Sequence, residues 1–66
     1  MEILVNGTPH IVPADTSVAQ LLVILDIHGK RLAVEVNQEL VPRSQFDSAI
    51  LNPHDSVEIV HAIGGG

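Results

Sequence analysis

Three consecutive glycines, Gly64, Gly65 and Gly66, end the sequence and carry the group best suited to chemistry. They follow Ile63 directly, so the last predicted strand runs straight into them. A glycine carboxylate has no Cβ beside it and is sterically open, and a slim glycine segment can thread a narrow channel in a partner. Activation of such a carboxylate by ATP would give an acyl-adenylate. A sulfur nucleophile would then displace the nucleotide and leave a thiocarboxylate, with every catalytic group supplied by the partner.

The alternative interpretation of these glycines is a frayed terminus with no function.

Composition narrows the functions that the chain can have. The chain has 66 residues, a formal net charge of −5 and no cysteine. One small domain is expected, because two cores cannot be built from so few residues. Disulfides, cysteine zinc sites and thiol nucleophiles are excluded, so any sulfur must come from another molecule.

Charge and hydropathy exclude two further classes of partner. The only basic residues are Lys30, Arg31 and Arg43, and the only aromatic residue is Phe46, whereas nucleic-acid binding needs a basic stripe and often aromatic platforms. No apolar run approaches the roughly 20 residues of a membrane span. The start, Met1-Glu2, lacks the basic region of a signal peptide. We therefore expect no nucleic acid, no membrane and a cytoplasmic location.

The titratable side chains do not form a recognisable site in the sequence. The histidines lie far apart and show no ligand spacing, so neither a bound metal nor a bound cofactor is expected. The carboxylates fall on different predicted elements, which gives no general acid–base pair. The chain is thus expected to be a protein co-substrate and not an enzyme. The four histidines are His10, His28, His54 and His61.

The elements that must position the glycines begin with a hairpin. At the start of the chain, one face of an extended segment is wholly apolar, with Met1, Ile3 and Val5, which is typical of a half-buried strand. The other face holds Glu2, Leu4 and Asn6. Asn6-Gly7 then tolerates the positive φ angles of a type I′ turn. Residues 8–12 return as a second strand, and Pro9, which cannot donate to a ladder, places that strand at a sheet edge.

A helix is predicted from Ser17 to Gly29. Ser17 and Gln20 have the spacing of a capping box. An apolar stripe with helical spacing follows the cap, and Gly29 stands where a left-handed C-terminal cap is expected.

Shorter elements complete the chain. They are a strand over 32–36, a very short strand at 40–41, a single helical turn over 43–47 and a last strand over 56–63. A hairpin that crosses by one long helix to further strands must bury one sheet face under that helix. The predicted fold is α+β, a β-grasp (ubiquitin-like) roll with a mixed sheet of about five strands on one main helix. One domain is expected over 1–63, followed by a flexible glycine tail over 64–66.

Strand parity predicts a docking surface on the open face of that sheet. If Ile3 and Ile59 face the helix, then Leu4, Val60 and Ala62 face outward. Scattered surface apolar residues are normal, but these lie close to the tail. A partner could hold the domain there while the tail enters its active site.

Taken end to end, the chain resembles the ThiS family of sulfur carriers, within the ubiquitin-like β-grasp group. The asparagine–glycine hairpin, the Val-Pro-Arg segment, the length and the glycine ending make the resemblance specific. The matching segments are Ile3-Leu4-Val5-Asn6-Gly7, Ser17-Val18-Ala19-Gln20-Leu21-Leu22, Val34-Glu35-Val36-Asn37, Val41-Pro42-Arg43 with Phe46, and Glu58-Ile59-Val60-His61-Ala62-Ile63 with the glycines.

The resemblance implies thiamine biosynthesis and a set of partners. An adenylating enzyme of the ubiquitin-activating type (ThiF type) would use ATP and Mg²⁺ on the Gly66 carboxylate. Sulfur would come from a cysteine desulfurase or another donor, and thiazole synthase (ThiG type) would consume it. Gly65 completes the family's Gly-Gly ending, and Gly64 stands where alanine or glycine is common.

Two alternatives stay open at this point. The small subunit of molybdopterin synthase also ends in Gly-Gly and donates sulfur, although such chains are usually longer. A non-catalytic ubiquitin-like interaction module would use its glycine tail for no chemistry or to add a strand to a partner sheet.

Overall fold

The first two strands form the predicted hairpin in the computed structural model, which describes residues 1–61. β1 (Glu2–Val5) pairs with antiparallel β2 (Thr8–Ile11). Asn6 and Gly7 adopt φ angles of +50° and +83°, as a type I′ turn requires. β2 lies at the edge of the sheet, as Pro9 predicted.

Helix α1 (Val18–Ile24) begins at the predicted cap. The Ser17 hydroxyl oxygen accepts from the Gln20 backbone N–H at 3.1 Å, and the Gln20 side-chain oxygen accepts from the Ser17 N–H at 3.0 Å. Two of the N–H groups left free at this helix end are thus satisfied reciprocally.

The helix ends earlier than predicted, and Gly29 does not cap it. Asp26 takes the left-handed position with φ of +55°. Its N–H donates to Val23 O at 3.0 Å, and Ile27 N–H donates to Leu22 O at 2.9 Å. This is a Schellman motif, which closes the helix one residue after Leu25. Aspartate tolerates left-handed angles better than most residues, so it can do what glycine was expected to do.

The remaining strands complete one mixed sheet of five strands in the order β2-β1-β5-β3-β4. β3 (Leu32–Val36) and β4 (Glu39–Val41) form a second antiparallel hairpin, followed by a short 3₁₀ turn, η1 (Arg43–Gln45). β5 (Ser56–His61) lies in the middle, parallel to β1 and antiparallel to β3. The predicted end of this last strand, at residues 62–63, lies outside the described residues.

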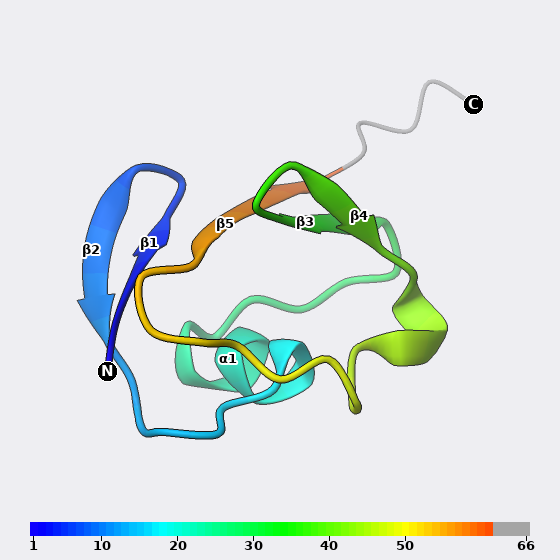
Figure 1. Ribbon diagram of the computed structural model, residues 1–66. Coiled ribbons are helices and arrows are strands. Elements are labelled where there is room, and N and C mark those ends of the chain that lie inside the picture. The colour runs from blue at the N-terminus through cyan, green and yellow to red at the C-terminus, as the bar shows by residue number, and fades with distance from the viewer. Residues whose placement is uncertain (62–66) are drawn as a thin grey trace.

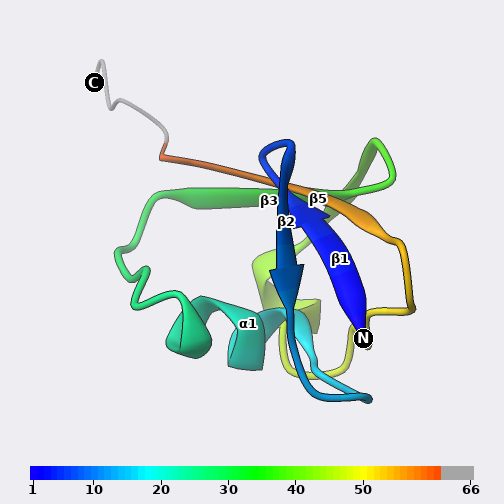
Figure 2. The same cartoon turned by 90° about the vertical axis from the view of Figure 1, so that its left-hand side faces the viewer.

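One sheet face is covered and the other is open. Figures 1 and 2 show α1 lying across one face, with no helix on the opposite face of the described chain. The core between α1 and the sheet contains Phe46 together with inward residues of the strands and the helix stripe. The buried apolar residues are Ile3, Val5, Val12, Val18, Leu21, Leu22, Val34, Phe46, Leu51, Val57 and Ile59. The α+β prediction and its mixed sheet are confirmed.

Within residues 1–61, no helix has the length and apolar character needed to cross a bilayer.

Ser17→Ala tests the capping box. The variant loses the hydroxyl that satisfies the Gln20 N–H, so we expect the free energy of unfolding to fall by about 1 kcal/mol. Urea denaturation followed by circular dichroism measures the change. Ser44→Ala, at an exposed position in η1, is the matched control and should shift stability by less than about 0.5 kcal/mol. Equal effects of the two substitutions would contradict the capping argument.

Candidate functional site

The strand that leads toward the glycines is the central strand of the sheet. β5 pairs with β1 through Leu4–Ser56 and Val5–Val57. It pairs with β3 from Val36–Val57 to Leu32–His61. His61 is the last described residue, so the segment that carries Gly64, Gly65 and Gly66 continues from the middle of the sheet and not from an edge. The glycines themselves lie outside the described residues.

Asn6 holds the C-terminal half of β5 after β1 has ended. Its Nδ2 donates to Ile59 O at 3.1 Å, and its Oδ1 accepts from Ile59 N–H at 2.8 Å. The side-chain amide therefore copies a backbone pairing and extends β1 by one step along β5. The sequence predicted Asn6 only as a turn residue. Its second role joins positions 53 residues apart, and no local pattern signals it.

Asn37 holds the other end of the same strand. Its Oδ1 accepts from Ser56 N–H at 3.0 Å, and its Nδ2 donates to Asp55 Oδ1 at 3.0 Å. Like Asn6, it has a positive φ, of +52°, and lies in the turn of a hairpin. Each of the two hairpins thus supplies one turn asparagine that binds β5 through its side chain.

The predicted docking residues that the structure describes do face outward. Leu4 is 37% exposed and Val60 is 54% exposed, both on the sheet face opposite α1. Ala62 lies outside the described residues. The register, however, places Leu4 beside Ser56, so Val60 lies four residues farther along β5, or about 13 Å at 3.3 Å per residue. Leu4 and Val60 are therefore two separate apolar spots and not one contiguous patch.

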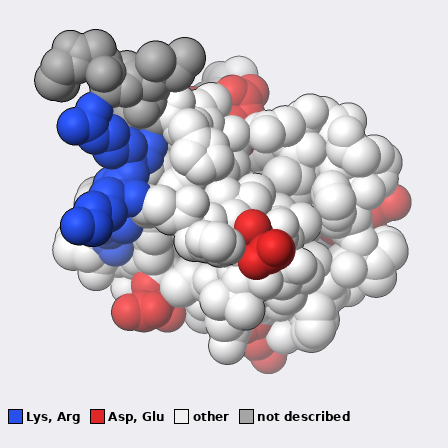
Figure 3. Space-filling model, turned by 180° about the vertical axis from the view of Figure 1, so that it is seen from behind, with Lys and Arg blue, Asp and Glu red and all other residues white. Residues whose placement is uncertain are grey.

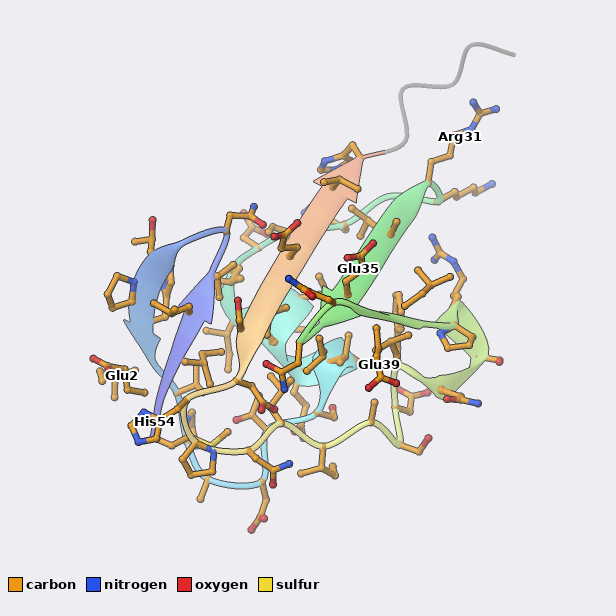
Figure 4. The ribbon with its side chains drawn as sticks, turned by 45° about the horizontal axis from the view of Figure 1, so that its top comes forward. Glu2, Arg31, Glu35, Glu39 and His54 are labelled. Carbon is orange, nitrogen blue, oxygen red and sulfur yellow. The ribbon has the colours of Figure 1, made fainter. Side chains whose placement is uncertain are left out.

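Carboxylates occupy the space between these spots. Glu58 lies directly opposite Glu35 on β3, and both side chains are exposed. Leu40, which is 67% exposed, pairs with Glu35 from the next strand. Figure 4 shows Glu35 along β3 in this part of the sheet. This face of the sheet is therefore both apolar and acidic. The two carboxylates lie directly opposite one another, and their repulsion disfavours the sheet in the free protein.

The histidines are dispersed over the described chain. His10 is half-buried on β2, His54 is in a turn with φ of +70°, and His61 is exposed at the end of β5. His28 lies beyond the helix, with its Nε2 3.1 Å from Asp26 Oδ1. Within residues 1–61, no three histidine, aspartate or glutamate side chains converge as metal ligands would.

Comparison with known proteins assigns the chain to a family. A model of the ThiS family matches residues 3–66, nearly the whole chain. The chain belongs to the ThiS family. The match includes all three glycines, although the structure does not describe them.

Known relatives agree with this assignment. The sulfur carrier protein ThiS of Escherichia coli is 33% identical, with all of both chains covered. The crystal structure of the thiamine biosynthesis protein ThiS from Geobacter metallireducens matches with a TM-score of 0.89 and 33% identity, again over 100% of both chains. A thiazole synthase of Magnetococcus marinus is 39% identical over the whole of this chain, which spans only 20% of that protein.

Family membership confirms several predictions. The fold is the β-grasp fold, and the chain is a small sulfur carrier of thiamine biosynthesis and not an enzyme. The match also favours the ThiS family over the molybdopterin synthase subunit, which was the other sulfur donor considered.

Asn6→Gly tests the side-chain link to β5. Glycine keeps the positive φ at no steric cost but removes both hydrogen bonds to Ile59. We expect the free energy of unfolding to fall by about 2 kcal/mol, or about 1 kcal/mol for each bond. Amide hydrogen exchange should also accelerate at Ile59. Asn6→Asp keeps the acceptor for Ile59 N–H but turns a carboxylate oxygen toward Ile59 O, so it should also lower the free energy of unfolding relative to the wild type. Unchanged stability and exchange in Asn6→Gly would contradict the assigned role.

Proposed function

We propose that the Gly66 carboxylate is the group on which this carrier transports sulfur. A carboxylate oxygen attacks the α-phosphorus of ATP, and pyrophosphate leaves. Hydrosulfide then attacks the carbonyl carbon of the acyl-adenylate, AMP leaves, and a thiocarboxylate remains. Where the donor is a persulfide, the first product is an acyl disulfide, and a thiol reduces it to release the thiocarboxylate. Its sulfur is passed on for thiazole formation in thiamine biosynthesis. The observation that carries the proposal is the family match, which runs from residue 3 through Gly66.

The proposal assigns the catalytic groups to partners. An adenylating enzyme of the ubiquitin-activating type binds ATP and Mg²⁺, and a cysteine desulfurase or another donor supplies the sulfur. Thiazole synthase accepts it. The last assignment is supported by relatives named thiazole synthase, in Magnetococcus marinus and Paramagnetospirillum magneticum, each of which contains a segment that matches this whole chain. In those relatives a carrier-like segment and a thiazole synthase share one polypeptide.

The position of β5 supports the role proposed for Gly64 and Gly65. These two glycines would thread the partner's channel because they lack side chains. The strand before them is hydrogen-bonded on both sides, up to the Asn6 contact at Ile59 on one side and the Leu32–His61 pair on the other. A partner that grips the sheet would thereby control the direction in which the glycine segment leaves.

The open sheet face is the proposed binding surface for the adenylating enzyme. Leu4 and Val60 would meet apolar side chains of the adenylating enzyme, and Ala62 would extend this contact toward the tail. Glu35 and Glu58, which lie between the two apolar spots, suit a basic group on the same enzyme surface. Interfaces of this kind combine buried apolar contacts with charges that select the partner.

Mass spectrometry tests the carrier chemistry. The intact mass of the isolated protein should first show that Gly66 ends in a free carboxylate. After incubation with the adenylating enzyme, ATP, Mg²⁺ and a sulfur donor, the mass should rise by the replacement of one oxygen by sulfur, located on Gly66. Deletion of Gly66 should abolish the product and the rescue of a thiamine auxotroph. A Gly66 bonded to a further residue, or full rescue by the deletion variant, would overturn the proposal.

Val60→Asp tests the sheet face. A carboxylate placed in an apolar contact is desolvated without a partner, so kcat/KM for adenylation should fall about tenfold or more, which corresponds to about 1.4 kcal/mol. Pyrophosphate exchange at varied carrier concentration measures this. Val23→Asp, on α1 at a position 79% exposed, is the matched control and should leave the kinetics unchanged. Equal adenylation of the two variants, both folded by circular dichroism, would remove Val60 from the interface.

A further inference from the structure

The basic residues of this acidic chain are all in one place. The formal charge is −5, with eight acids against three bases. Lys30 and Arg31 are consecutive in the loop before β3, and Arg43 Nη2 donates to Gly29 O at 3.3 Å and to Lys30 O. Lys30, Arg31 and Arg43 therefore form one group, here called the basic cluster. Figure 3 shows the basic side chains along one edge, with acidic side chains spread over the rest of that face.

The basic cluster borders the end of β5. Leu32, the residue after Arg31, pairs with His61. A Cβ built on Gly29 would lie 3.9 Å from ring atoms of His61, so the loop that carries Lys30 is in contact range of that side chain. Figure 4 shows Arg31 extending outward at this end of the sheet. The positive charge is thus concentrated where the chain continues toward Gly66.

The fold holds this cluster in position. The Arg43 guanidinium lies 5.8 Å from the centroid of the Phe46 ring, and Phe46 is buried in the core. The ion pair recorded within residues 1–61 is His28 with Asp26, and it includes none of the three bases. Gathering three cations without a neutralising carboxylate from residues 1–61 disfavours the free protein, while it leaves their field available to a partner.

The reach of the chain limits what the cluster can touch. Five residues follow His61, and five fully extended residues span at most about 18 Å. If this segment is threaded into a channel, as proposed above, an adenylate on Gly66 lies beyond the reach of side chains anchored at Lys30 and Arg31. The cluster then faces the protein surface around the channel opening and not the nucleotide phosphates.

We propose that the basic cluster docks on an acidic protein surface at the opening of the adenylating enzyme's active-site channel. This inference rests on the proposed function. The cluster and the widely spread acids give the carrier an uneven charge distribution, with its positive end beside the glycine segment. An acidic surface at the opening attracts that end and repels the others, so the carrier approaches with its glycines first. The effect is mainly on the rate of association.

Arg31→Glu tests the proposal with a charge-matched control. The substitution takes the formal charge from −5 to −7, and so does the double variant Gln20→Glu/Gln38→Glu, which places two new carboxylates away from the cluster. Association with the adenylating enzyme is measured by stopped-flow fluorescence without ATP. In low salt, Arg31→Glu should associate about tenfold more slowly than the double variant. At about 1 M salt, where the screening length is about 3 Å, the difference should disappear.

The outcomes separate this inference from the proposed function. Equal association of Arg31→Glu and the control variant would overturn the inference, as would a difference that persists at high salt. A raised KM for ATP with Arg31→Glu would overturn it in favour of contact with the phosphates. Thiocarboxylate formation by the wild type is followed separately, so failure of the carrier chemistry is visible whether or not the association rates respond to Arg31.

Discussion

β5 lies between two hairpins that do not pair with each other, and its hydrogen bonds on both sides join the sheet into one unit. Backbone pairing with β1 covers only the start of the strand, because the β1 register ends at Val57. Asn6 continues that side as far as Ile59, and Asn37 secures the start at Ser56. Without β5 the hairpins would each expose a strand edge, and α1 would cover two separate ribbons. The same strand leads toward the glycines, so the element that completes the fold also precedes the group proposed to carry sulfur.

A domain this small forms one core, and here that core lies between α1 and a single sheet face. The other face does not contribute to this core. It carries Leu4, Val60 and Leu40 in exposed positions around the Glu35–Glu58 pair. Since an exposed apolar residue contributes little to folding, and facing carboxylates oppose it, these residues leave this face available for the contact with the adenylating enzyme that is proposed above. The absence of cysteine fits the proposed chemistry, in which the sulfur comes from another molecule and is held on the Gly66 carboxylate.

Local signals in the sequence predicted local structure well. The Asn6-Gly7 turn and the Ser17–Gln20 capping box are decided by residues within a few positions of each other, and both formed as predicted. The predicted end of the helix was wrong because two residues could adopt the left-handed φ that closes it, and Asp26 does so before Gly29. The outward direction of Leu4 and Val60 followed from parity, but their separation depends on the register between β1 and β5. That register, like the Asn6 contact with Ile59, joins distant parts of the chain and leaves no short-range pattern.

The glycine ending creates a problem of recognition that the rest of the domain must solve. In the proposed function, three residues without side chains would offer a partner only backbone atoms and a carboxylate, and other sulfur-donating carriers with a Gly-Gly ending would offer the same. A channel that accepts the tail therefore cannot tell one carrier from another by the tail alone.

Discrimination has to come from side chains that border the glycine segment, and the structure has two such regions of opposite character. The open face is acidic and apolar, and the Lys30, Arg31 and Arg43 cluster is basic. A partner surface that complements both must place a basic apolar area and an acidic area in fixed relation to its channel. If both proposed contacts form, a carrier whose glycines fit but whose charges are arranged otherwise would meet repulsion at one of them, and specificity would come from these contacts and not from the reacting group.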